Sequence, residues 1–130
     1  MSVEVKKLSN EPIIIFNFIE PLDVLADITE ANTQTAKYLH KTDETLYRID
    51  NLLGVTIDFG KLVEGMARAT RAKDEGSLRN DRVKTILVTH QKDFGDIMQN
   101  GFQQDQYGSL DIKAFSTLDD ALNFARKSFD

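Results

Sequence analysis

The beginning of the chain first alternates and then concentrates its apolar side chains, which is typical of two neighbouring strands. Residues 3–6 place valines on one side of an extended segment and charged side chains on the other, which predicts a half-exposed strand at a sheet edge. Turn-forming residues follow at 9–12. Every position of Ile13–Ile19 except Asn17 is apolar, as in strands buried on both faces. We therefore predict a central strand here, covered by helices on both sides.

A helical spacing of apolar residues begins after this strand. Pro21 suits the first turn of a helix, because the amide proton that it lacks has no partner there. Asp23 carries a negative charge, which favours the positive end of the helix dipole. The polar segment 41–44 ends the pattern. The buried face expected for this helix consists of Leu22, Leu25, Ile28, Thr35 and Leu39.

Shorter apolar segments predict further strands and helices in the middle of the chain. Leu46–Ile49 indicates a third strand, although the charged residues Arg48 and Asp50 interrupt it. A helix is expected over 59–73, and a strand over 82–90. The apolar face of the next helix consists of Phe94, Ile97, Met98 and Phe102.

The last segment predicts a strand followed directly by a helix. Leu110, Ile112 and Ala114 alternate with polar residues in a strand that ends at Phe115. Ser116-x-x-Asp119 and Thr117-x-x-Asp120 both match a capping box at a helix start. The stripe of this helix consists of Leu118, Ala121, Leu122 and Ala125.

The order of these elements predicts an α/β architecture. Strands and helices alternate with short connections, which favours right-handed crossovers and parallel pairing. We expect a mixed, mostly parallel sheet of four to five strands with about four helices, in the order β-β-α-β-α-β-α-β-α. Residues 1–130 contain no repeat and no linker, so the sequence predicts a single domain.

Composition narrows the classes of function. The net charge of −5 disfavours nonspecific binding to nucleic acid, which depends on lysine and arginine at the phosphates. Cysteine is absent, so disulfides and thiolate chemistry are excluded, and a reducing cytoplasm fits. The apolar run 13–19 is too short to span a bilayer, and the amino-terminal residues lack the apolar stretch of a secretory signal. We therefore expect a cytoplasmic protein without a membrane span.

Two stretches resemble a known family. Asn51-Leu52-Leu53-Gly54-Val55-Thr56-Ile57-Asp58-Phe59-Gly60, followed by Leu62-Val63, is similar to the strand-to-helix turn of anti-sigma-factor antagonists. Phe115-Ser116-Thr117-Leu118-Asp119-Asp120-Ala121-Leu122 is similar to their closing strand–helix junction. With the order of elements, these stretches make the chain resemble STAS domains, and more specifically the SpoIIAA-like (STAS/SEC14-type) proteins.

The resemblance implies a non-catalytic regulatory module without a cofactor. Its partner would be a regulatory kinase or an anti-sigma-like factor, and a homodimer is a further alternative. The antagonists carry a phosphorylated serine after the aspartate, and Phe59 occupies that place here. Thr56 is a hydroxyl residue two positions before Asp58. His90 is added as a candidate because it follows a parallel strand, where α/β folds place ligands. The candidate binding residues are Thr56, Asp58, Phe59, Gly60, Lys61 and His90.

The segment from Gly54 to Lys61 also invites comparison with a phosphate-binding loop. That loop needs four residues between its glycines and a hydroxyl residue after its lysine. Here five residues separate Gly54 from Gly60, and Leu62 replaces the hydroxyl. We therefore interpret the segment as a turn that uses Gly60 for tight packing.

Two other classes of function remain open. A SEC14-type carrier would hold a small apolar or lipid-like ligand in a cavity, lined for example by Phe94, Met98, Phe102 and Tyr107. An enzyme would use acid–base groups, for which the candidates are Glu20, Asp50, Asp58 and His90, or a relay of Ser116, His90 and Asp50. A basic cluster could hold an acidic partner surface or a phosphate; it comprises Arg68, Arg71, Lys73, Arg79, Arg82 and Lys84.

Overall fold

The strands and helices of the described part follow the order that the sequence predicts. The computed structural model describes residues 3–58, 60, 61, 63–65, 67, 80–91, 93, 95–97, 100 and 112–129. The elements are β1 (Val3–Lys7), β2 (Ile13–Phe18), α1 (Val24–Leu39), β3 (Leu46–Asn51), β4 (Val83–Val88), β5 (Lys113–Phe115) and α4 (Leu118–Phe129). Described residues between 60 and 67, and between 93 and 100, are also helical.

The strands of the described part form one mixed sheet. Their order is β1-β2-β3-β4-β5, so neighbours in the chain are neighbours in the sheet. β1 pairs with β2 antiparallel, and all later pairs are parallel. The predicted α/β class and the predicted edge position of the first strand are therefore confirmed.

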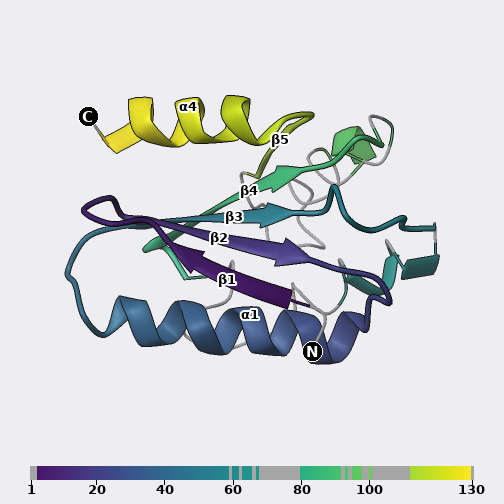
Figure 1. Cartoon of the computed structure of the whole chain (residues 1–130), viewed down its shortest axis with the longest axis horizontal. Helices are drawn as coiled ribbons and strands as arrows, with labels where there is room; N and C mark the ends of the chain where they lie inside the picture. Colours follow the sequence, from purple (N-terminus) through teal and green to yellow (C-terminus); the bar gives the residue numbers. More distant parts are fainter. Residues whose placement is uncertain are drawn as a thin grey trace.

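Helices cover both faces of this sheet (Figure 1). α1 lies against β1 and β2 on one face, and α4 lies against β3, β4 and β5 on the opposite face. α1 belongs to the crossover between β2 and β3, whereas α4 follows the last strand and folds back over the other side. We call these two sides the α1 face and the α4 face.

Each face has its own hydrophobic core. Side chains of directly paired strand residues share a face, so the register separates the two sets. The α1-face core includes Ile14, Phe16, Phe18, Ala31, Leu39, Leu46, Leu52, Val55, Ile57, Val83 and Leu87. The α4-face core consists of Ile13, Ile15, Tyr47, Ile49, Ile86, Val88, Ala121 and Ala125.

β2 is the internal strand that the apolar run predicts. Ile13, Ile14 and Phe16 have no exposed surface, and β2 lies between β1 and β3. Ile19 lies beyond the end of the strand and is 41% exposed. A run that is apolar on both sides thus becomes the strand that contributes to both cores.

The buried face of α1 differs from the predicted one. Leu25 is 50% exposed, whereas Val24, Asp27, Ala31, Asn32, Thr35 and Leu39 are buried. Only Thr35 and Leu39 of the predicted stripe are fully buried, and Leu22 packs against the core from a position before the helix. The prediction was wrong because it excluded Asp27 and Asn32, two polar side chains that lie under the helix.

α4 matches its prediction closely. Thr117 Oγ1 accepts a hydrogen bond from the backbone N of Asp120 at 3.1 Å, which is a helix N-cap. Ala121 and Ala125 are fully buried, and Leu118 and Leu122 pack against the same core. The small side chains of Ala121 and Ala125 thus let α4 lie close to the sheet.

Several expectations fall outside the described residues or need correction. The predicted helical positions 68–73, together with Phe94, Met98, Phe102 and Leu110, lie outside them. Ile97, expected on a packed face, is 46% exposed. Within the described part of the chain, no helix combines the length and apolar character needed to cross a membrane.

Candidate functional site

The segment that follows β3 lies on the surface, and buried side chains anchor it to the hydrophobic core. Leu52, Val55 and Ile57 are buried in the α1-face core. Thr56 and Asp58 are exposed, as expected when alternate residues of an extended segment point to opposite sides. The segment therefore presents Thr56 and Asp58 to solvent on an apolar base.

Hydrogen bonds tie this segment to the ends of the neighbouring strands. The backbone N of Thr56 donates to Glu20 Oε1 at 2.6 Å, just beyond β2. Gln91, which follows β4, accepts from the backbone N of Ile57 at 3.1 Å and donates to its carbonyl at 3.0 Å. These contacts bring the carboxyl ends of β2, β3 and β4 together, at the edge where α/β folds place ligands.

The close backbone approach in this segment occurs at Gly54. A Cβ atom at Gly54 would lie 2.9 Å from the carbonyl oxygen of Phe18. A Cβ atom at Gly60 would lie 3.4 Å from Asp58 Oδ1, which is an ordinary contact. The prediction that Gly60 provides the tight packing was therefore wrong, because the chain crosses the end of β2 at Gly54.

A short helical segment begins beside Asp58. Asp58 Oδ1 accepts a hydrogen bond from the backbone N of Lys61 at 2.8 Å, the geometry of a helix N-cap. Gly60 is exposed and Lys61 is half-buried. Val63 is 43% exposed, so an aliphatic side chain of this segment faces solvent. Phe59 and Met66 lie outside the described residues.

The candidate residues that the structure describes thus fall on one edge of the sheet. Thr56, Asp58, Gly60 and Lys61 share one continuous segment. His90 is exposed and directly precedes Gln91, which holds that segment through Ile57. We call the exposed residues Thr56, Asp58, Gly60, Val63 and Glu64 the docking segment.

The carboxylates proposed for acid–base chemistry are engaged with separate donors. Glu20 accepts from Thr56, Asp58 caps the helical segment, and Asp50 forms an ion pair with Arg48 at 2.8 Å. Asp50 is therefore paired with a buried arginine on the α1 face. Among the described residues, no group of three or more histidines and carboxylates is arranged to hold a metal ion.

The basic cluster is described only at Arg82 and Lys84. Arg82 Nη2 donates to the backbone carbonyls of Leu39, Thr42 and Glu44, at the edge opposite the docking segment. This arginine therefore fixes the connection between α1 and β3. Lys84 is exposed on β4. Arg68, Arg71, Lys73 and Arg79 lie outside the described residues, as do Phe94, Met98, Phe102 and Tyr107.

A buried polar cluster under α1 was missed by sequence reasoning. Arg48 is 1% exposed; its Nε donates to Asp50 Oδ1 at 2.8 Å and its Nη1 to Asn32 Oδ1 at 2.6 Å. The guanidinium lies over the ring of Phe16, 5.1 Å from the centroid. The one available signal was the spacing of Arg48 and Asp50, which puts both side chains on the same face of a strand.

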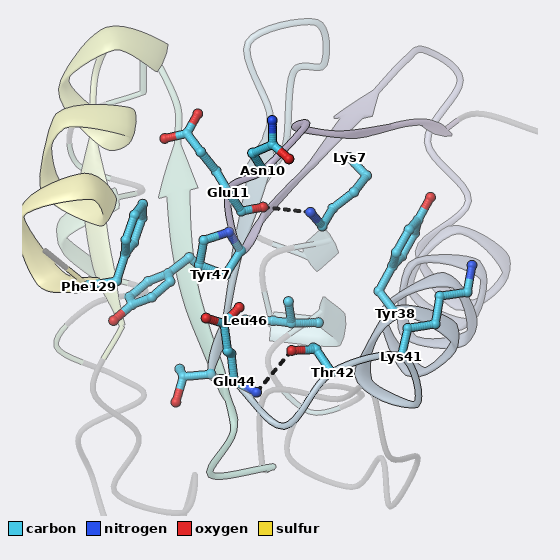
Figure 2. A pocket seen from close by; sticks show the side chains of 12 residues that line it. Lys7, Asn10, Glu11, Tyr38, Lys41, Thr42, Glu44, Leu46, Tyr47 and Phe129 are labelled. Atoms are coloured by element: carbon cyan, nitrogen blue, oxygen red, sulfur yellow. Dashed lines mark hydrogen bonds between the residues drawn. The ribbon is translucent and has the colours of Figure 1, made fainter.

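A pocket of about 700 Å³ opens at the amino ends of the parallel strands, opposite the docking segment. Charged and aromatic residues line it together, including Lys7, Glu11, Tyr38, Lys41, Tyr47 and Phe129 (Figure 2). It is partly open and of mixed polarity, so it differs from the enclosed apolar cavity that the carrier hypothesis requires.

The fold defines an α/β protein with a mixed, mostly parallel sheet between helices. No protein-family model matches the chain, and no curated protein matches it.

Proposed function

We propose that this chain is a non-catalytic, STAS-like regulatory module that binds a protein partner through the docking segment. One observation carries the proposal: Thr56 and Asp58 are exposed, yet Ile57 between them and Val55 before them are buried, and the backbone of Ile57 is hydrogen-bonded. Val55 and Ile57 are less than a tenth exposed, and the backbone of Ile57 is held on both sides by Gln91. A surface that is already ordered loses little conformational freedom when it binds, so more of the contact energy remains as affinity.

The chemistry of the docking segment suits a protein surface. Val63 offers an apolar contact, and Asp58 and Glu64 are exposed acidic residues of the same segment. An exposed apolar side chain surrounded by polar groups is a common arrangement in protein interfaces. A basic partner surface with an apolar pocket for Val63 fits this segment best.

The resemblance to anti-sigma-factor antagonists supports a kinase-like or anti-sigma-like partner. In those proteins the serine after the aspartate accepts phosphate, and Phe59 stands at that position here. Thr56 is the exposed hydroxyl of the docking segment, and its backbone is fixed through Glu20. Within the docking segment, Thr56 is therefore the residue that would accept phosphate. A phosphate there would add negative charge next to Asp58 and strengthen the attraction to a basic partner surface.

The test compares two substitutions of exposed aliphatic residues. Val63→Asp places a charge in the docking segment, and Ile97→Asp is the matched control on another helical segment, at 46% exposure. Each purified variant captures partners from a lysate of the source cells, with quantitative mass spectrometry of the eluate. We expect Val63→Asp to lose a kinase-like or anti-sigma-like protein that Ile97→Asp retains. The binding affinity for that purified protein should fall by about tenfold or more.

Thermal melting on the same samples separates binding from folding. Both side chains are exposed, so both variants should melt within a few degrees of the natural chain. Equal capture by all three proteins would contradict the docking segment. Capture of an enzyme substrate or a lipid alone, with no protein sensitive to Val63, would contradict the regulatory class. A Thr56→Ala variant incubated with the captured kinase shows whether this threonine is the acceptor.

A further inference from the structure

The pocket at the amino ends of the strands brings together four separate parts of the chain. The β1–β2 turn, the end of α1 with the loop after it, the start of β3 and the end of α4 all contribute. Its volume of about 700 Å³ lies in the range of sites for small organic molecules. Among the described residues, it lies at the opposite edge of the sheet from the docking segment, and the inference below is independent of that segment.

One wall of the pocket is aromatic. The rings of Tyr47 and Phe129 lie 5.5 Å apart between centroids, at 46° to each other. Leu46 lies between this wall and Tyr38, which stands on the other side (Figure 2). Flat apolar molecules bind well to such surfaces, because ring contacts add to the burial of apolar area.

The opposite wall carries positive charge. Lys7 Nζ donates to the backbone carbonyls of Leu8 at 2.9 Å and of Glu11 at 2.5 Å, so the ammonium is held by the main chain. Lys41 Nζ lies 5.2 Å from the centre of the Tyr38 ring. Figure 2 shows Lys7, Lys41 and Tyr38 together on the side away from Phe129.

The carboxylates of the pocket only partly offset these cations. Glu11 is held by two hydrogen bonds from Arg126, at 2.8 and 3.0 Å. Those bonds hold the pKa of the Glu11 carboxyl below its usual range, so it remains ionised and paired. Glu44 is exposed at the loop, and its backbone carbonyl accepts from Arg82. The lining thus holds two lysines and two carboxylates, and Arg126 outside it neutralises Glu11. Lys7 and Lys41 are then offset by Glu44, on a chain whose net charge is −5.

We propose that this pocket binds a small organic anion with a flat apolar body. The anionic group lies toward Lys7 and Lys41, and the body lies against Tyr47, Phe129 and Leu46. Asn10, Thr42 and Thr45 also line the pocket and supply polar contacts at its rim. Because the chain as a whole repels anions, binding of one at this place depends on the local lysines.

A pair of fluorescent probes tests both features of this ligand. Anilinonaphthalene sulfonate is a flat aromatic anion, and N-phenylnaphthylamine has nearly the same body without the charge. We expect the full-length chain to bind the sulfonate at one site, with an affinity about tenfold higher than for the neutral probe. Added salt should weaken the binding of the sulfonate but not that of the neutral probe, because salt screens the attraction between the sulfonate and the lysines. Equal affinity for both probes would show that the pocket does not select anions.

Matched variants locate the site on the molecule. Lys41→Gln should weaken sulfonate binding by about fivefold, and Lys37→Gln, an exposed lysine one turn earlier on α1, should not change it. Phe129→Ala should lower the binding affinity for both probes by about tenfold. Phe124→Ala removes an equivalent ring from α4 that contacts Phe115 instead of Tyr47, so it controls for lost stability. If Phe124→Ala and Phe129→Ala weaken binding equally, the probe reports loosened structure and the proposal is wrong.

Amide chemical shifts provide the final check with the natural chain. Bound sulfonate should shift the amides of residues 7–11 and 41–47, and leave those of 54–58 unchanged. Shifts confined to 54–58 or to His90 and Gln91 would place the ligand at the opposite edge and overturn the assignment.

Discussion

At the scale of single residues, the most unusual feature is a fully buried arginine. Arg48 lies between α1 and the sheet, with Asp50 on its own strand and Asn32 on the helix as hydrogen-bond acceptors. A buried charge is tolerated only when it is paired and hydrogen-bonded. The pair does not by itself make the protein more stable than an apolar core would, since desolvation offsets much of the attraction. Its loss, however, leaves a charged group without its partner.

Replacing Arg48 by leucine should therefore destabilise the chain strongly. Arg48→Leu leaves the Asp50 side chain, which is 11% exposed, without its cation, and the expected loss is about 3–5 kcal/mol. Urea unfolding monitored by circular dichroism measures the change. The double variant Arg48→Leu/Asp50→Leu should recover part of it, because the unpaired carboxylate is removed as well. A single-variant loss below about 1 kcal/mol would mean that the ion pair is not needed at this site.

The bond between Glu11 and Arg126 predicts a pH dependence. Its hydrogen bonds lower the pKa of the Glu11 carboxyl in the folded chain. The folded chain then binds that proton less readily than the unfolded chain does. Stabilisation by this bond is therefore fully present above the unfolded pKa, about 4.3, and is lost as the pH falls through the lowered value.

An NMR titration of the Glu11 side-chain carboxyl measures this pKa directly. In Arg126→Gln, the pKa of Glu11 should rise toward the ordinary value of about 4.3. Lys127→Gln removes the exposed cation next to Arg126 on α4 and should leave it lowered. The same upward shift in both variants would assign the effect to general charge and not to the hydrogen-bonded pair.

The residue scale also shows why the polar cluster was not predicted. Hydrophobic patterns place charged residues outside, so Arg48 and Asp50 counted against a strand. Asn32, which accepts from Arg48, is sixteen positions away along the chain. Nothing local to either residue encodes that contact, because it exists only after β3 has paired and α1 has crossed the sheet.

At the scale of elements, strong patterns predicted the strands and the last helix well. The apolar run of β2 fits a strand that is buried on both faces. The apolar stripe of α4 fits a helix that packs one side against the sheet. α1 has apolar residues on more than one side, so the pattern allowed a face containing Leu25. The observed face is set by tertiary structure, since Asp27 and Asn32 lie toward the sheet. The docking segment was identified as a turn, but its fixation by Glu20 and Gln91 depends on contacts between strand ends.

Two glycines in this turn should respond differently to alanine. Gly54→Ala places a Cβ atom 2.9 Å from a backbone oxygen, and backbone cannot move away cheaply. The expected loss of stability is about 1–3 kcal/mol, as for other overpacked sites. Gly60→Ala meets only an ordinary contact in a helical segment, so it should be neutral or stabilise by up to about 1 kcal/mol.

The urea unfolding midpoints of Gly54→Ala and Gly60→Ala measure these two changes in stability. Each variant is the control for the other, because the side chain added is the same. A larger loss at Gly60 than at Gly54 would show that the chain does not cross the end of β2 as described. The natural chain's docking segment would then have a different path.

At the scale of the whole molecule, the sheet separates two candidate binding edges and two cores. The docking segment lies at the carboxyl ends of the parallel strands, and the pocket lies at their amino ends. The sequence predicted candidate binding residues at the carboxyl ends of the strands, because strand ends can be identified from sequence. The pocket was not predicted, because residues 7–12, 38–47 and Phe129 become neighbours only through the folded arrangement of β1, α1 and α4.

The α4-face core depends on a close fit that a single charge should disrupt. Ala121 and Ala125 are fully buried against a sheet face that includes Ile13, Ile15 and Ile49. Ala125→Asp puts an unpaired carboxylate in that core, and the expected loss is about 3 kcal/mol or more. Asn123→Asp introduces the same side chain at an exposed position of α4 and should change stability by less than about 0.5 kcal/mol.

Size-exclusion chromatography and urea unfolding on these two variants test the layered arrangement. If α4 covers the sheet, Ala125→Asp exposes a contiguous apolar surface and should self-associate as well as unfold early. It should also lose the aromatic wall of the pocket, since Phe129 is carried by the same helix and contacts Tyr47. Asn123→Asp should remain like the natural chain in both respects. An Ala125→Asp protein with unchanged midpoint and elution would mean that α4 does not close this face, and the pocket built on Phe129 would be wrong with it.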